Sequence, residues 1–312
     1  MSFAAFVKKE LVQIESSTCC QISELSALIK MNGTISLSSN GLTLSFNTEN
    51  AAIARRVLEL LKNNFSNIET SVLSRKKANL KKNNTYVIGI QRYARVVAME
   101  LGILTDEGFV HNVSESLIQE ECCKRAYLRG AFLAGGSVNN PETSSYHFEI
   151  FTEHDEHVRS LQKLLNEFNL NARVLARKKG YITYIKEAEK ISDFLRVVGA
   201  MGAVLNFEDV RIMRDIRNSD NRLNNCEIAN ETKTLTAADR QVEDIRLIES
   251  VHGMDFLSDK LRYVANLRLE FAEENLTYLS EVATQRGHKL TKSGINHRIR
   301  KIAEVANELR GG

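Results

Sequence analysis

The feature that most constrains the fold of this chain is an internal repeat. The segment Val72–Lys77 returns later as Val174–Lys179, with basic residues at the same three places. Three more pairs of matching segments precede it and keep the same order in both copies. They are Cys19-Cys20 with Cys122-Cys123, Phe46–Glu49 with Ile150–Glu153, and Arg55–Leu61 with Arg159–Leu165. A repeat this long exceeds the unit of a solenoid protein. It predicts two copies of one half-domain about a pseudo-two-fold axis, a symmetry that suits duplex DNA.

Length and composition set the broad class. The 312 residues are 43% hydrophobic and 26% charged, with a net charge of +3, which is typical of a globular protein with two or three domains. There is no apolar run long enough for a membrane span, and Met1–Glu10 is too short and too polar for a signal peptide. We therefore expect a cytoplasmic protein without a membrane partner.

The five cysteines form neither a CxxC zinc motif nor a disulfide framework. Adjacent cysteines do not easily bridge each other. We expect the doublets Cys19-Cys20 and Cys122-Cys123 to pack as small buried hydrophobes. A cluster of both doublets across the pseudo-two-fold axis stays open as an alternative. We predict no cofactor and no metal ion.

The pattern within the repeat predicts an α+β fold. The two copies span about residues 19–90 and 122–205. In the first, apolar periodicity and turn residues predict the order αββαββ, with helices over Ile22–Lys30 and Ala51–Asn63. The second copy repeats it, with helices over Arg125–Ala134 and His157–Asn169, and adds a helix over Ala188–Val198. The domain of residues 1–205 would thus carry two curved sheets that form a saddle.

The remainder of the chain differs in composition and pattern from the repeat. In residues 206–230 arginines alternate with asparagines; the start could be helical, and the asparagine-rich part is typical of a linker. Residues 231–312 predict an all-α domain with amphipathic helices over Ala237–Ser250 and Ser258–Glu273. Its last segment, Leu276–Leu309, is predicted to be two helices about a short turn that ends the first helix at Gly287.

One nine-residue segment of the repeat, Leu128–Gly136, has a clear structural logic. Gly130 and Ala134 are four residues apart and so share one helix face, which a second helix can approach closely. The counterpart in the first copy is Leu25–Gly33, with Ala27 at the position of Gly130. We expect the two helices to pack side by side at the pseudo-two-fold axis.

This pattern resembles the LAGLIDADG homing endonucleases. In that family the eighth residue of the nine is an acid, and the two acids hold the Mg²⁺ ions that cleave DNA. Carboxylates suit this hard cation, which activates the attacking water. Asn32 and Gly135 stand at these positions here, and neither is an anion. We therefore predict that the fold is retained and the nuclease activity lost.

Two basic segments could let the saddle contact DNA. They are predicted to be turns at equivalent places in the two copies, and a solvated charged loop is the alternative. Their residues are Arg75, Lys76, Lys77, Arg177, Lys178 and Lys179.

The C-terminal helix has the pattern of a recognition helix, with an apolar back and polar donors near its start. Arg binds guanine and Asn binds adenine through two hydrogen bonds each, whereas lysines position the protein on phosphates. A plain amphipathic surface helix is the alternative. The apolar stripe comprises Ile295, Ile299, Ile302, Ala306 and Leu309; the opposite face carries Ser293, Asn296, His297 and Arg300, with Lys301 beside it; and Lys289, Lys292 and Arg298 suit phosphate contacts.

Taken together, nearly the whole chain resembles the WhiA family of bacterial regulators. The most specific stretches are Lys124–Ser137, Arg217–Glu227 and Thr291–Arg298. The resemblance implies a degenerate homing-endonuclease domain joined to a helix-turn-helix. It implies a non-enzymatic, nucleoid-associated protein that binds double-stranded DNA and acts in cell division, chromosome segregation or transcription regulation, including sporulation. Protein partners, an active Mg²⁺-dependent endonuclease, and a scaffold whose saddle binds a protein or small ligand remain alternatives.

Overall fold

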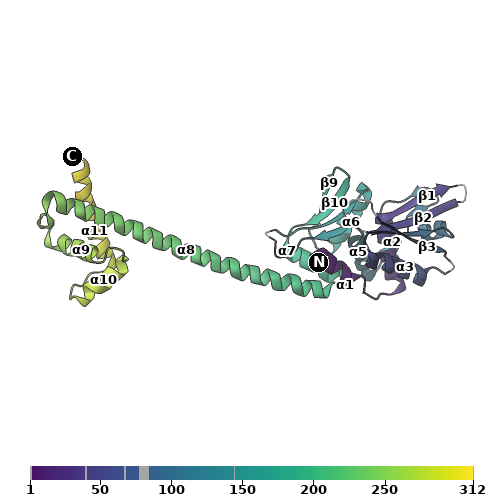
Figure 1. Ribbon diagram of the computed structural model, residues 1–312, viewed down its shortest axis with the longest axis horizontal. Coiled ribbons are helices and arrows are strands. Elements are labelled where there is room, and N and C mark those ends of the chain that lie inside the picture. Colours follow the sequence, from purple (N-terminus) through teal and green to yellow (C-terminus); the bar gives the residue numbers. More distant parts are fainter. Residues whose placement is uncertain (1, 39–40, 67, 77–83, 144, 312) are drawn as a thin grey trace. The chain divides into compact units, whose positions relative to one another are not determined.

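The computed structural model describes residues 2–38, 41–66, 68–76, 84–143 and 145–311 (Figure 1). The chain divides into two compact units, Met1–Arg214 and Asp215–Gly312. Each unit has its own hydrophobic core.

The first unit contains the predicted duplication. The first copy comprises α2 (Thr18–Asn32), β1 (Gly33–Ser38), β2 (Gly41–Thr48), α3 (Ala51–Asn64), β3 (Thr70–Lys76) and β4 (Asn84–Ile90). The second comprises α5 (Glu121–Gly135), β7 (Gly136–Val138), β8 (Phe148–Thr152), α6 (Asp155–Glu167), β9 (Arg173–Arg177) and β10 (Gly180–Ile185). Both sheets are antiparallel, in the equivalent orders β1-β2-β4-β3 and β7-β8-β10-β9. The predicted αββαββ order is confirmed in both copies.

Other elements complete this unit. α7 (Ala188–Val198) follows the second copy as predicted. α1 (Phe3–Leu11) lies outside the repeat and buries Phe3, Val7 and Leu11 in the common core. The bridge between the copies holds α4 (Ala94–Glu100), the short strands β5 (Leu104–Thr105) and β6 (Gly108–Phe109), and a 3-10 turn at Glu115–Leu117.

Helices α2 and α5 pack side by side, with one sheet on either side of the pair (Figure 1). Gly130 makes this approach close. A Cβ atom there would overlap the carbonyl oxygen of Glu24 and lie 3.0 Å from Cβ of Ala27. The expectation that small residues bring the two helices together is therefore confirmed.

A buried ion cluster also joins the two helices. Glu24 of α2 is fully buried and accepts hydrogen bonds from Nε of Arg56 at 2.9 Å and from Nε of Arg129 at 2.8 Å. Arg56 belongs to α3 and Arg129 to α5, and both are buried. One carboxylate thus binds two guanidinium groups, one from each copy. Such groups stabilise a fold only when every partner is in place.

A second buried polar group lies in the other copy. His157 accepts or donates through both ring nitrogens, to the hydroxyl of Tyr127 at 2.9 Å and that of Thr152 at 3.2 Å. Burial, with a smaller effect of the Lys30 charge, lowers the pKa of His157 to about 3. The histidine is therefore neutral in the folded chain at neutral pH.

The asparagine-rich segment differs from the expected irregular linker. It is helical throughout, because α8 runs without a break from Met201 to His252. The hydroxyls of Thr232, Thr234 and Thr236 each donate to the carbonyl four residues earlier, so these side chains find partners within the helix itself. The domain boundaries at 205 and 230 stay predictions.

The second unit is all-α, as predicted. The end of α8 is followed by a 3-10 turn at Met254–Phe256, α9 (Asp259–Glu270), α10 (Leu276–Gln285) and α11 (Lys292–Gly311). Within the part of the chain that the structure describes, no helix combines the length and apolar content needed to cross a bilayer.

The buried carboxylate gives a stability prediction. Glu24→Gln removes the anion and leaves two guanidinium groups buried together, which should cost about 3–5 kcal/mol of unfolding free energy. Urea denaturation followed by circular dichroism measures the loss. Glu149→Gln is the matched control, because it changes only the partly exposed contacts of Glu149 with Arg177 and His147 and should cost less than about 1 kcal/mol. Equal midpoints for Glu24→Gln and the parent would contradict this account of the core.

The buried histidine predicts a pH dependence. The unfolded chain, with a His157 pKa near 6.5, binds a proton more readily than the folded chain, so stability should fall as pH drops from about 6.5 toward 3. One such group changes the unfolding free energy by at most about 1.4 kcal/mol per pH unit. Denaturation of the parent and of His157→Gln across this range measures the effect. The variant should show a flatter profile, and parallel profiles would exclude His157 as the cause.

Candidate nucleic-acid interface

The first candidate interface is built by α10, the following turn and α11. Asn275 caps α10 by accepting from the backbone N–H groups of Thr277 and Tyr278 at 2.9 and 3.0 Å. The turn uses Gly287, whose φ of +86° is in the left-handed region that glycine tolerates. The hydroxyl of Ser280 donates to the carbonyl of Leu290 at 2.6 Å and so fixes the turn against α10.

The start of α11 is defined by a side-chain cap. Thr291 precedes the helix, and its Oγ1 accepts from the backbone N–H of Gly294 at 3.2 Å. Ser293 lies inside the first turn and is exposed. Its hydroxyl therefore faces outward beside Lys292, where a ligand could reach it.

The two faces of α11 are arranged as the sequence predicts. Ile295 and Ile299 are buried in one apolar cluster and Ile302 and Ala306 in a second, against which Leu309 packs. The opposite side is open to solvent. Lys292, Ser293, His297, Arg300 and Lys301 are exposed, as is Lys289 in the turn, whereas Asn296 and Arg298 are half-buried.

Two arginines make the support for these helices rigid. Arg268 is buried in α9, and its Nη1 donates to the carbonyls of Phe271 and Glu274 at 3.1 and 2.6 Å. Arg286 makes a two-bond pair with Glu270 at 2.7 and 2.6 Å, which ties the end of α10 to α9. These contacts fix the loop between α9 and α10 and join the end of α10 to α9, the two helices against which α11 packs.

The basic segments of the saddle differ in detail from the predicted turns. Arg75 and Lys76 are part of the edge strand β3 and are exposed. Lys77 lies outside the described residues. Arg177 ends β9, and only Lys178 and Lys179 form a turn. A guanidinium nitrogen of Arg177 is 3.0 Å from Oε2 of Glu149, so its charge is partly neutralised.

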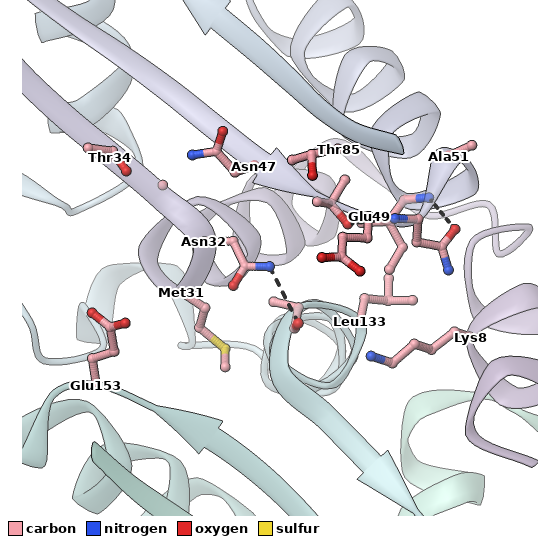
Figure 2. Close-up of a pocket in the computed structure, with 15 residues that line it drawn as sticks. Lys8, Met31, Asn32, Thr34, Asn47, Glu49, Ala51, Thr85, Leu133 and Glu153 are labelled. Atoms are coloured by element: carbon pink, nitrogen blue, oxygen red, sulfur yellow. Dashed lines mark hydrogen bonds between the residues drawn. The ribbon is translucent and has the colours of Figure 1, made fainter. Parts of the chain in front are cut away.

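The second candidate site is the hollow at the C-terminal ends of α2 and α5 (Figure 2). It measures about 860 Å³ and contains Asn32, one of the two positions at which the sequence predicts a lost metal ligand. Asn32 lines it and donates from Nδ2 to the carbonyl of Ala134 at 3.4 Å. Its amide therefore joins the two helix ends, where a nuclease would hold a metal ion.

Gly135 occupies the equivalent position of the second copy, and its surroundings leave no space for a side chain. A Cβ atom there would lie 2.5 Å from the carbonyl oxygen of Phe151 and 2.6 Å from Cε of Met31. A carboxylate could return only if the backbone of β8 moved. The chain has therefore closed the space that the second acid would need.

Other charges line this hollow, and Figure 2 shows Glu49, Glu153 and Lys8 around it. The two glutamates end the repeated segments Phe46–Glu49 and Ile150–Glu153, so the repeat itself could have identified them. Burial lowers the pKa of Lys8 to about 8, which leaves it mostly cationic at neutral pH. A lysine in the same hollow as Asn32 disfavours a divalent cation. Among the described residues, no trio of His, Cys, Asp or Glu at this hollow is close enough to share an ion.

Comparison with known families agrees with this architecture. The family model described as the WhiA N-terminal LAGLIDADG-like domain matches residues 18–104, the WhiA LAGLIDADG-like domain matches 124–217, and the WhiA C-terminal HTH domain matches 221–306. Two copies of a LAGLIDADG-like half-domain followed by a helix-turn-helix thus define the class of this protein.

Relatives extend the match to full length. The chain is 53% identical to the "Probable cell division protein WhiA" of Bacillus cytotoxicus and 54% identical to that of Bacillus mycoides, covering 100% of this chain and 98% of each relative. Its fold is similar to the crystal structure of full-length DUF199/WhiA from Thermatoga maritima, with a TM-score of 0.58 and 27% identity over 99% of this chain and 98% of that one. The chain belongs to the WhiA family.

Proposed function

We propose that this chain is a non-enzymatic protein that binds double-stranded DNA and acts in bacterial cell division. The observation that carries the proposal is the two-sided character of α11. Its apolar stripe is buried in the helix-turn-helix core, and its polar side from Ser293 to Arg300 is open to solvent. A recognition helix requires this division between support and contact.

The chemistry of the open side fits the major groove. Ser293, Asn296, His297 and Arg300 follow the spacing of one helix face. Arg300 is suited to two hydrogen bonds with guanine, and Asn296 to the equivalent pair with adenine. Lys289, Lys292 and Arg298 would contact phosphates and position the helix, with Lys301 at the border.

The saddle has a supporting role in this proposal. Arg75, Lys76, Lys178 and Lys179 are exposed on or beside the edge strands of the two sheets, at places related by the repeat. They would add phosphate contacts that do not depend on sequence. Arg177 would contribute less, because Glu149 already neutralises part of its charge.

The state of the former metal centre argues against endonuclease activity. Phosphodiester cleavage by Mg²⁺ needs carboxylates that hold the ion and lower the pKa of bound water. The two positions carry an amide engaged with Ala134 and a glycine without space for a side chain. The ammonium group of Lys8 lines the same hollow.

The cellular role rests on the relatives, which are named as probable cell division proteins. We propose that the chain acts in the cytoplasm on the nucleoid, through transcription regulation, chromosome segregation or both, with protein partners in these processes. A genome-wide footprint at a stated salt concentration separates these roles. Binding concentrated at promoters supports regulation, and broad binding without promoter preference supports segregation.

The helix assignment predicts how DNA binding responds to substitution. Arg300→Ala should weaken specific binding by about 1–3 kcal/mol, or about 5- to 150-fold, and relax the preference at one base pair. Arg300→Lys keeps the charge but loses the two-bond geometry, so it should also relax that preference. Fluorescence anisotropy on the parent site and on sites with single base changes measures both effects.

The phosphate contacts predict a different response. Lys292→Ala should weaken binding evenly across sequences and reduce the slope of log affinity against log salt by about 1. The matched control is Lys233→Ala in α8, which removes the same charge from an exposed helix outside α10 and α11. If Arg300→Ala and Lys292→Ala both bind like the parent, α11 is not the recognition helix.

The loss of the metal centre predicts no cleavage. Supercoiled plasmid incubated with the purified chain and Mg²⁺ or Mn²⁺ should stay supercoiled. Asn32→Ala identifies the source of any nicking, because a contaminating nuclease would act equally in both preparations. Cleavage by the parent that Asn32→Ala abolishes would establish the enzyme and overturn this part of the proposal.

A further inference from the structure

The two cysteine doublets meet at the N-terminal ends of the paired helices. Cys19 and Cys20 are the second and third residues of α2, and Cys122 and Cys123 hold the same places in α5. The four sulfur atoms all lie within 4.8 Å of one another. The close packing of α2 against α5 thus gathers four thiols at the end opposite the former metal centre.

The spacing of these sulfurs suits one small ion. Zinc binds four thiolates as a tetrahedron with Zn–S distances near 2.3 Å, which places sulfurs about 3.8 Å apart. The observed separations, all within 4.8 Å, exceed this value by no more than about 1 Å. Adjacent cysteines do not easily form a disulfide with each other, so each doublet keeps both thiols available as ligands.

Burial divides the four thiols into two inner and two outer groups. Cys20 and Cys123 are 5% exposed and pack with Ala126, whereas Cys19 and Cys122 are exposed. The outer pair gives an ion a path to the inner pair. The cluster is therefore apolar on its inner side and open to solvent on its outer side. An ion that enters from solvent can be enclosed by the four sulfur atoms.

The electrostatic surroundings favour negative charge. The N-terminal ends of α2 and α5 both carry partial positive charge, which stabilises thiolates nearby. The hydroxyl of Ser17 lies 3.3 Å from the sulfur of Cys19. Burial raises the pKa of Cys20 and raises that of Cys123 to about 12, so both inner thiols favour the protonated form when no ion is bound. An ion must therefore displace these protons, and its affinity should rise with pH.

We propose that Cys19, Cys20, Cys122 and Cys123 bind one thiophilic divalent metal ion, of which zinc is the prime candidate. Each thiol that ligates loses its proton to solvent, so up to four protons leave as one ion binds. The resulting four-thiolate complex carries two negative charges, which the two helix N-termini offset. The ion joins the two copies of the repeat at one end of α2 and α5. This departs from the sequence-based expectation of small apolar packing without a metal ion.

The experiment uses the reduced, metal-free full-length chain. Titration with Co²⁺ should produce sulfur-to-cobalt charge-transfer absorption and the visible bands of a tetrahedral thiolate site, saturating at one ion per chain, and Zn²⁺ should abolish both. In a second measurement, the parent chain reacts with a thiol reagent in the absence and in the presence of Zn²⁺. Zn²⁺ should protect four of the five cysteines and leave Cys226 reactive.

Variants locate the site. Cys20→Ser and Cys122→Ser should each lower Co²⁺ affinity at least about tenfold. Cys226→Ser, which removes an exposed thiol outside the cluster, should bind like the parent. Cys122 is exposed, so its substitution keeps the test available if Cys20→Ser fails to fold. Absence of thiolate bands in the parent, equal protection of all five thiols, or unchanged affinity in Cys122→Ser would overturn the proposal, and none of these results bears on DNA binding by α11.

Discussion

The arrangement of the first unit depends on a buried carboxylate. Glu24 receives Arg56 from its own copy and Arg129 from the other, beside the close contact of α2 and α5 at Gly130. Removing these charges from water has a large cost, which is offset only when all three groups meet. The triad therefore fixes one relative position of the two helices, and with it the position of both sheets.

The same interaction breaks the symmetry of the repeat. With Leu25 matched to Leu128, the position of Glu24 is taken by Tyr127 in the second copy, and that of Arg129 by Ser26 in the first. Tyr127 bonds to His157, while Ser26 donates to the carbonyl of Leu101 at 2.6 Å. Two α2 helices packed together would bring two glutamates to one buried place without Arg129. The polar groups thus favour pairing of unlike copies within one chain.

The two ends of the α2–α5 pair carry side chains of different chemistry. At the C-terminal end, neither Asn32 nor Gly135 is an acid, Lys8 adds a cation, and the backbone of Phe151 occupies the space that a side chain at Gly135 would need. The candidate chemistry of the saddle then lies in its surface charge and in the cysteine cluster.

Much of the fold could be predicted from the sequence, because the duplication shows the same pattern of apolar and turn residues twice. The order of helices and strands, the small-residue contact at Gly130 and the buried stripe of α11 all follow from local spacing. The triad could not be predicted, since one carboxylate on a largely buried helix does not show which distant arginines reach it. Nor could the helical state of the asparagine-rich segment, whose residues have weak intrinsic helix preference. The equivalence of Glu49 and Glu153 could be predicted, because the repeat aligns them. Their place in the hollow that holds Asn32 could not, because it depends on tertiary packing.

The most direct test of the account is a methylation-protection experiment on a bound DNA site in the presence of Mg²⁺. The account predicts that guanine N7 atoms in the major groove become protected, that Arg300→Ala removes protection at one guanine, and that both DNA strands stay intact. Strand breaks at the bound site, or binding that leaves every major-groove guanine reactive, would contradict it.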